Sequence, residues 1–170
     1  MKYTLAIIVL LVGHFLHSQS RDEKLQQLNI KFPEKGKPLG NYADFVRVGN
    51  LIFLAGKGPL QENGTYVNGK LGKELSVEQG YHAAKLTAVH QLTILMNELG
   101  GLSRIKRIIK VNGYVNCENN FHDQAKVVNG FSDLLIEIFS KNGKHARTAI
   151  GVNSLLSNMA VEIEMIVEVE

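Results

Sequence analysis

Two stretches of the chain repeat their apolar residues every three or four positions, which is the spacing of an amphipathic helix. Ser76 and Gln79 form a capping box ahead of the first stretch, and Gly100 follows its end. The second stretch covers 121–140 and stops at Asn142-Gly143. We therefore predict two long helices, each with one buried stripe. The expected stripes are Val77, Tyr81, Ala84, Ala88, Leu92, Leu95 and Leu99 in the first helix, and Val127, Val128, Phe131, Leu134, Leu135 and Ile138 in the second.

Five shorter segments have the residues and the alternation of strands. Residues 42–48 and 51–55 flank Gly49-Asn50, a pair that favours a tight hairpin. Further strands are expected at 105–117, 147–152 and 160–169. The predicted order is β-β-α-β-α-β-β. Because each helix has one stripe to bury, we predict a two-layer α+β domain with a sheet on one side and two helices on the other.

The sheet face away from the helices is expected to carry apolar residues. The alternation places Ile52, Leu54 and Ile166 on this uncovered face, among polar neighbours. Such residues suggest that the face meets another subunit. The alternative interpretation is that they are scattered surface residues without a role, which are common in soluble proteins.

The first 20 residues have the pattern of a secretory signal peptide. A short basic start precedes an apolar run from Leu5 to Leu16, and Ser18 and Ser20 supply the small residues before a cleavage site. A retained membrane anchor is the alternative, but the run is shorter than the roughly 20 apolar residues of a membrane span. We expect a secreted or periplasmic protein that makes no membrane contact after cleavage.

The rest of the chain has the length of one domain. Of 170 residues, 45% are hydrophobic, which is ordinary for a globular fold. Residues 21–39 are polar and contain Pro33 and Pro38, so an extended N-terminal arm is expected there. Residues 40–170 then form the domain.

Composition excludes several functions. Cleavage removes Lys2 and leaves 18 basic and 16 acidic residues, a net charge of +2, so no nucleic-acid partner is expected. The single Cys117 forms no intramolecular disulfide and is expected to be a small buried hydrophobe. No Cys/His spacing suits a metal, and no phosphate loop, dinucleotide fingerprint or Ser-His-Asp set is found, so no cofactor is expected. The four histidines of the mature chain are expected on the surface or on a helix face: His82, His90, His122 and His145.

The C-terminal segment has the most informative pattern. Arg147 opens one strand, Leu155-Leu156 follows as a turn, and Glu162 lies in the closing strand Val-Glu-Ile-Glu. In these residues the chain resembles the Rid/YjgF family of reactive-intermediate (enamine/imine) deaminases, also called the endoribonuclease L-PSP family. Leu156 stands where the family has Pro. The resemblance covers Gly40 to Val169, and its other motifs are Gly40-Asn41-Tyr42, Val48 to Phe53 with Gly56, and Asn129.

The resemblance implies a chorismate-mutase-like fold and a homotrimer with sites in clefts between subunits. It also implies hydrolysis of 2-imino or enamine acids to 2-oxo acids and ammonia without a cofactor. Two alternatives stay open: a non-catalytic trimer that binds small carboxylates, and, with less support, an endoribonuclease. The implied catalytic residues are Arg147 and Glu162, and the implied substrate-binding residues are Tyr42, Ala55, Gly56, Asn129 and Ala149.

The chemistry of these residues fits the implied roles. A guanidinium such as that of Arg147 holds a carboxylate through two parallel hydrogen bonds. A carboxylate such as Glu162, with its pKa raised in a partly dry cleft, can deprotonate water and return the proton. The alternative is that Arg147 only pairs with Glu162 or Glu164 across adjacent strands and that Tyr42 is only a core residue. The chain also departs from the family, with Ala149 in the place of Cys and Ala55 in the place of Ser.

Overall fold

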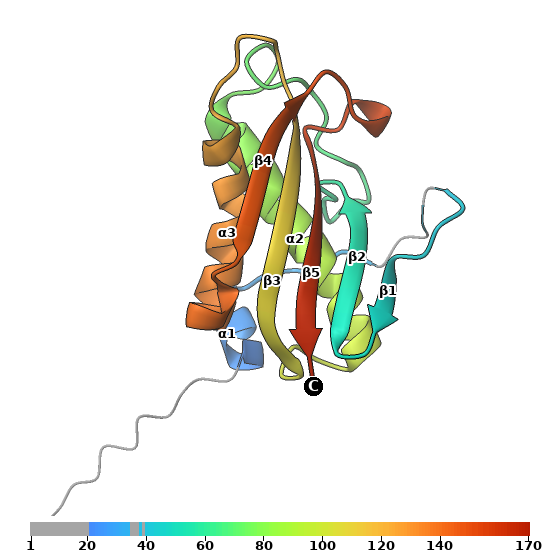
Figure 1. Cartoon of the computed structure of the whole chain (residues 1–170). Helices are drawn as coiled ribbons and strands as arrows, with labels where there is room; N and C mark the ends of the chain where they lie inside the picture. The colour runs from blue at the N-terminus through green and yellow to red at the C-terminus, as the bar shows by residue number, and fades with distance from the viewer. Residues whose placement is uncertain (1–20, 35–37, 39) are drawn as a thin grey trace, which may run out of the picture.

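The computed structural model of the chain describes residues 21–34, 38 and 40–170, and the predicted signal peptide lies outside these described residues. It contains one five-stranded sheet with helices on one face, in the predicted α+β order (Figure 1). Within the described part, no helix is long and apolar enough to cross a membrane. The elements are α1 (Arg21–Gln27), β1 (Phe45–Val48), β2 (Leu51–Lys57), α2 (Val77–Leu99), β3 (Ile105–Asn116), α3 (Gln124–Phe139), the short 3-10 helix η1 (Ser140–Gly143), β4 (Ala146–Val152), η2 (Leu156–Asn158) and β5 (Val161–Val169).

The sheet order is β1-β2-β5-β3-β4, so the C-terminal strand lies in the middle. Neighbouring strands are antiparallel except for β3 and β4, which are parallel because α3 carries the chain back across the sheet. Strand β2 contains one extra residue between Leu54 and Lys57 relative to β5. This is a β-bulge, a feature that often lies beside active sites.

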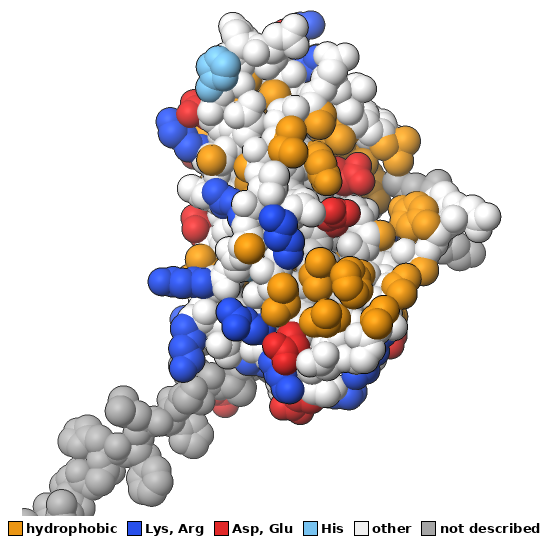
Figure 2. Space-filling model, in the orientation of Figure 1, with side chains coloured by type: hydrophobic (Ala, Val, Ile, Leu, Met, Phe, Trp, Pro, Cys, Tyr) orange, Lys and Arg blue, Asp and Glu red, His pale blue; other side chains and the backbone are white. Residues whose placement is uncertain are grey.

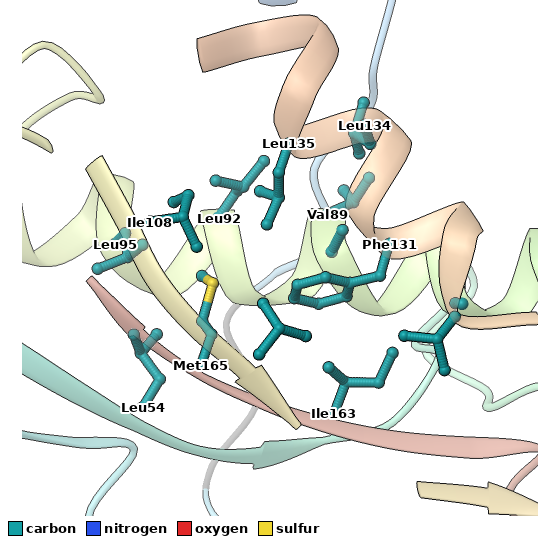
Figure 3. Close-up of a cluster of buried hydrophobic side chains, with 14 of the residues drawn as sticks. Leu54, Val89, Leu92, Leu95, Ile108, Phe131, Leu134, Leu135, Ile163 and Met165 are labelled. Atoms are coloured by element: carbon teal, nitrogen blue, oxygen red, sulfur yellow. The ribbon is translucent and has the colours of Figure 1, made fainter. Parts of the chain in front are cut away.

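Helix α2 begins at its predicted capping box, whereas α3 begins at Gln124, three residues later than predicted. The predicted stripes are buried except at Val77 and Tyr81, which are partly exposed. Ser76 Oγ accepts from the backbone N–H of Gln79 at 3.2 Å, and Gln79 Oε1 accepts from that of Ser76 at 2.8 Å. Helix α2 ends at Gly100, whose positive φ of 73° suits glycine. The core lies between these helices and the sheet (Figure 3) and includes Leu92, Leu95, Ile108, Phe131, Leu135, Ile163 and Met165.

The prediction for the uncovered face is wrong for two of its three residues. Ile52 and Leu54 are 0% and 4% exposed and face the helices, whereas Phe53 points to the open side and is 41% exposed. Ile166 does lie on the open face, where it pairs with Phe53. Residues 51–55 are all apolar, so their pattern contains no polar position to mark the outward side.

The open face carries apolar and basic side chains on different halves (Figure 2). Apolar groups gather over β1 and β2, where Val46 and Val48 are 57% and 62% exposed beside Phe53. Lysine and arginine side chains gather toward β3 and β4. We call the set Val46, Val48, Leu51, Phe53 and Ile166 the apolar patch.

The N-terminal arm is not extended at its start. Residues Arg21–Gln27 form the helix α1, and Leu25 on it is buried in the core. Arg21 donates to the carbonyls of Leu102 and Ile105, and its guanidinium lies 5.2 Å from the ring centroid of Phe139. The polar composition of this segment does not predict the helix, because contacts of Arg21 and Leu25 with distant parts of the chain stabilise it.

Candidate functional site

Glu162 lies on the open face of β5, half-buried and paired with Tyr114 of β3. Burial raises the pKa of its carboxyl, the neighbouring Glu164 raises it further, and the charge of Lys57 opposes both effects. Gly56 of β2 lies directly against it, because a Cβ there would collide with the Glu162 carboxylate. The raised pKa favours the protonated form of the Glu162 carboxyl, and Gly56 leaves room for the carboxyl group.

The β2 bulge fixes the backbone beside Glu162. Gln91 on α2 is fully buried and donates through Nε2 to the carbonyl oxygens of Ala55 at 2.9 Å and of Ile163 at 2.8 Å. One amide group thus joins β2 to β5 where the bulge interrupts their ladder. The site backbone is tied to the helix layer as well as to the sheet.

Tyr42 precedes β1 and is 45% exposed, so it is not a core residue. Its ring centroid lies 5.2 Å from Nζ of Lys57, within the range of a cation–π contact. Lys57 Nζ in turn donates to Asp44 Oδ1 at 2.7 Å, and both side chains of this ion pair are buried. We call the predicted residues on this side the Glu162 cluster: Tyr42, Ala55, Gly56 and Glu162.

Arg147 lies near the start of β4, the edge strand beside α3. Its NH1 donates to Asn129 Oδ1 at 2.8 Å and to Ser132 Oγ at 3.0 Å, and its NH2 donates to the Ala125 carbonyl at 3.4 Å. All three partners belong to α3. Asn129, a predicted substrate-binding residue, is therefore a direct partner of Arg147, and α3 fixes the guanidinium.

A cavity of about 350 Å³ opens beside this guanidinium and is also lined by His145. His145 Nε2 lies 3.1 Å from Ser132 Oγ, so His145 is not an isolated surface residue. Ala149 follows Arg147 on the same face of β4 and packs against the core. We call the following residues the Arg147 cluster: Asn129, Ser132, His145 and Arg147.

The two clusters do not meet within one chain. Arg147 pairs with the buried Val111 of β3 and so faces the helices, whereas Glu162 pairs with Tyr114 on the opposite face. Strand β3 separates β4 from β5. A cross-strand pair of Arg147 with Glu162 or Glu164 is therefore absent from the described part of the chain.

The other predictions for reactive side chains have mixed outcomes. Cys117 is buried, as predicted. His90 lies on α2 but at a buried position, where it donates through Nδ1 to the Gly58 carbonyl at 3.2 Å. No group of three or more His, Cys, Asp and Glu in residues 21–34, 38 and 40–170 is arranged to hold a metal ion.

Sequence reasoning missed the Lys57–Asp44 pair and the roles of Ser132 and His145. One signal was available for His145, which lies two positions before Arg147, so that an extended chain presents both on one side. No signal pointed to Ser132 or to Asp44, because their partners come from distant parts of the chain.

Comparisons with known proteins agree with this fold. A family model described as "YjgF/chorismate_mutase-like, putative endoribonuclease" matches residues 22–167. Protein TCP17 of Trypanosoma cruzi is 38% identical over 145 residues, which cover 85% of this chain and 91% of that protein. A 2-iminobutanoate/2-iminopropanoate deaminase of Dermatophagoides farinae is 29% identical, covering 83% of this chain and 95% of that protein. A crystal structure from Shewanella oneidensis, titled as a putative endoribonuclease, superposes with a TM-score of 0.85 at 29% identity, covering 89% of this chain and 100% of that one.

Proposed function

The chain belongs to the YjgF/chorismate mutase-like family, and we propose that it hydrolyses 2-imino or enamine acids to 2-oxo acids and ammonia at clefts between subunits. The observation that carries the proposal is the separation of Arg147 from Glu162 in one chain. Each has the surroundings its role requires, and only a second copy can bring the two together. The deaminase name of the Dermatophagoides relative supports the reaction class.

The open face supports an assembly of this kind. Its apolar patch lies over β1 and β2, whereas basic side chains gather toward β3 and β4 (Figure 2). Two different surfaces favour a head-to-tail contact, which closes into a ring when the rotation permits. In the proposed homotrimer, the Arg147 cluster of one subunit faces the Glu162 cluster of the next.

The proposed reaction uses both clusters. The Arg147 guanidinium binds the carboxylate of the 2-imino acid and fixes the position of C2. The Glu162 carboxylate takes a proton from a water molecule as the water oxygen bonds to C2 and the C=N electron pair moves to nitrogen. Glu162 passes this proton to the nitrogen, which gives a carbinolamine with a hydroxyl and an amino group on C2. The carboxylate then takes the hydroxyl proton as the carbonyl forms and the C–N bond breaks, and this second proton goes to the departing nitrogen, which leaves as ammonia. Water and the imine are consumed, ammonia and the 2-oxo acid are released, and no redox step occurs.

The remaining residues of the two clusters would shape the cleft. Tyr42 presents an exposed aromatic ring beside the cleft wall, and the Gly56 backbone can approach a ligand closely because it lacks a Cβ. Ala55 and Ala149, in the places of a Ser and a Cys in the family pattern, make these two walls apolar. A substrate with an apolar side chain suits such a pocket.

The test is turnover of imines formed in the assay by an amino-acid oxidase with catalase. We expect the protein to accelerate ammonia release, and we expect Arg147→Ala to abolish this acceleration. Arg104→Ala, which removes an exposed arginine from the turn before β3, is the matched control and should leave the rate unchanged. Full activity in Arg147→Ala would overturn the proposal. Stabilisation by 2-oxo acids without ammonia release from any imine would identify a non-catalytic binder instead.

We infer further that the mature protein acts outside the cytoplasm. The inference rests on the leader pattern of residues 1–20, which lie outside the described residues. Amino-acid oxidation in that compartment is one class of reaction that forms 2-imino acids. The test is N-terminal sequencing of the protein recovered from an exporting host, which should begin at Arg21; an intact Met1 would contradict it.

A further inference from the structure

The hydrogen bonds that link Arg147, Ser132, His145 and Gly143 fit one assignment of donors and acceptors. His145 Nδ1 lies 2.6 Å from the Gly143 carbonyl oxygen, which can only accept, so Nδ1 carries the hydrogen. In a neutral imidazole Nε2 is then an acceptor, and it accepts from the Ser132 hydroxyl at 3.1 Å. Ser132 Oγ has no second hydrogen to donate and accepts from Arg147 NH1. The chain runs from Arg147 through Ser132 to His145 and ends on the backbone at Gly143.

The surroundings keep His145 neutral. Burial lowers the pKa of its imidazole, the hydrogen bond to Gly143 opposes this, and the charge of Arg147 lowers the pKa again. The other charged groups lining the same cavity are Asp133 on α3 and Lys144 just before β4. Ser132 is only 6% exposed, so water does not compete freely for its hydroxyl.

The same contacts decide which edge of the guanidinium is open. Both hydrogens of NH1 are used, by Asn129 and Ser132, and one hydrogen of NH2 points to the Ala125 carbonyl. In the described part of the chain, Nε–H and the second NH2 hydrogen have no partner. These two donors are parallel and form the side-on edge of the fork, which matches the two oxygens of a carboxylate.

We propose that Ser132 and His145 are positioning residues that hold Arg147 with its Nε–NH2 edge presented to the carboxylate of the ligand. This inference rests on the proposed function, in which the Arg147 guanidinium binds the carboxylate, and it specifies which residues hold that guanidinium in position. Without Ser132, NH1 regains a free hydrogen and the guanidinium can turn about its side chain. The carboxylate then loses one fixed hydrogen bond.

The test is calorimetric binding of 2-oxobutanoate to the full mature protein, together with steady-state kinetics on the matching imine. Ser132→Ala should raise Kd about tenfold, the loss of one charge-assisted hydrogen bond, with KM rising more than kcat falls. His145→Phe, which keeps a ring of similar size, should do the same. His145→Gln offers an acceptor near the Nε2 position and should retain most of the affinity. His82→Gln, at an exposed position of α2, is the matched control and should bind as the wild type does.

A double variant separates positioning from general support of the fold. Because Ser132 and His145 act through one chain of bonds, Ser132→Ala with His145→Phe should raise Kd no more than either change alone. The inference would be overturned if the two increases in Kd multiplied in the double variant, or if Kd were unchanged in both single variants. If Ser132→Ala fails to fold, the contrast of His145→Phe with His145→Gln decides. If Arg147→Ala bound 2-oxobutanoate as tightly as the wild type, the result would count against the proposed function itself. If Arg147→Ala lost binding while the Ser132 and His145 variants kept it, only the positioning roles would be rejected.

Discussion

Arg147 and Glu162 lie on opposite faces of the same sheet, with β3 between their strands. The first is fixed by α3 and the second is backed by the bulge of β2. Neither can reach the other by a change of rotamer, because a strand of the sheet stands between them. The proposed site therefore requires two chains, and that requirement can be tested directly.

Two inactive variants should restore activity to each other. Arg147→Ala keeps an intact Glu162 cluster, and Glu162→Gln keeps an intact Arg147 cluster. If they are unfolded together and refolded as mixed trimers, about a quarter of the clefts should receive both intact clusters. Imine turnover of the mixture should reach that fraction of the wild-type value. Each variant refolded alone serves as the control, and a mixture as inactive as its components would contradict a shared cleft.

The apolar patch should hold the assembly together. Phe53→Glu places a charge at its centre and should convert the protein to monomers, because an unpaired carboxylate would be buried in the interface. Phe53→Leu keeps the position apolar and should preserve the assembly. Light scattering after size-exclusion chromatography measures both masses. A Phe53→Glu variant with the wild-type mass would show that the patch is not the contact surface.

Glu162→Gln should stabilise the folded chain at neutral pH. Burial raises the pKa of Glu162 above that of an unfolded glutamate, so the ionised form costs stability at pH 7. The cost disappears once the pH falls below about 4, where the unfolded side chain is also protonated. We therefore expect a higher Tm for Glu162→Gln at pH 7 and a shrinking difference toward pH 4.

The comparison belongs in the Phe53→Glu background, so that no second subunit alters the surroundings of Glu162. Glu168→Gln on the same strand face is the control. It removes a carboxylate that accepts from Asn50 and pairs with Lys106, so no gain is expected from it. A constant difference between Glu162→Gln and its parent at all pH values would contradict the assigned cause.

The Lys57–Asp44 ion pair should matter for stability chiefly when it is broken on one side. Lys57→Met removes the ammonium 2.7 Å from a buried carboxylate and should cost about 3 kcal/mol in the free energy of unfolding. The double change Lys57→Met with Asp44→Leu removes both charges and should recover most of that loss. Urea unfolding measures all three proteins. Equal losses in the single and double variants would show that the carboxylate does not depend on this partner.

The helices were predictable from sequence because their signals are local. The Ser76–Gln79 box and the spacing of the apolar stripes need no knowledge of the rest of the fold. The faces of β2 were not predictable, because residues 51–55 are apolar without interruption. Only the pairing of β2 with β5 determines that Ile52 and Leu54 face the helices and that Phe53 faces outward.

The site was predictable to the extent that it follows the family pattern in sequence. The pattern named Arg147, Asn129, Glu162 and Gly56 as site residues, but their division into an Arg147–Asn129 group and a Glu162–Gly56 group is seen only in the fold. Ser132 and His145 were not predictable as a pair, because the end of α3 and η1 fold between them. Their roles depend on bond directions, which only the folded arrangement fixes.

The middle strand of the sheet, β5, comes latest along the described part of the chain. Until β5 emerges, the β1–β2 hairpin has no connection to β3 and β4, and the bulge of β2 lacks the partner strand against which Gln91 ties it (Figure 1). The native sheet therefore cannot form before β5 has been synthesised. Removal of the last ten residues, 161–170, would take away all of β5 and leave the β1–β2 hairpin without a strand that joins it to β3 and β4. A chain with this order can therefore complete its five-stranded sheet only after Val169 has been added.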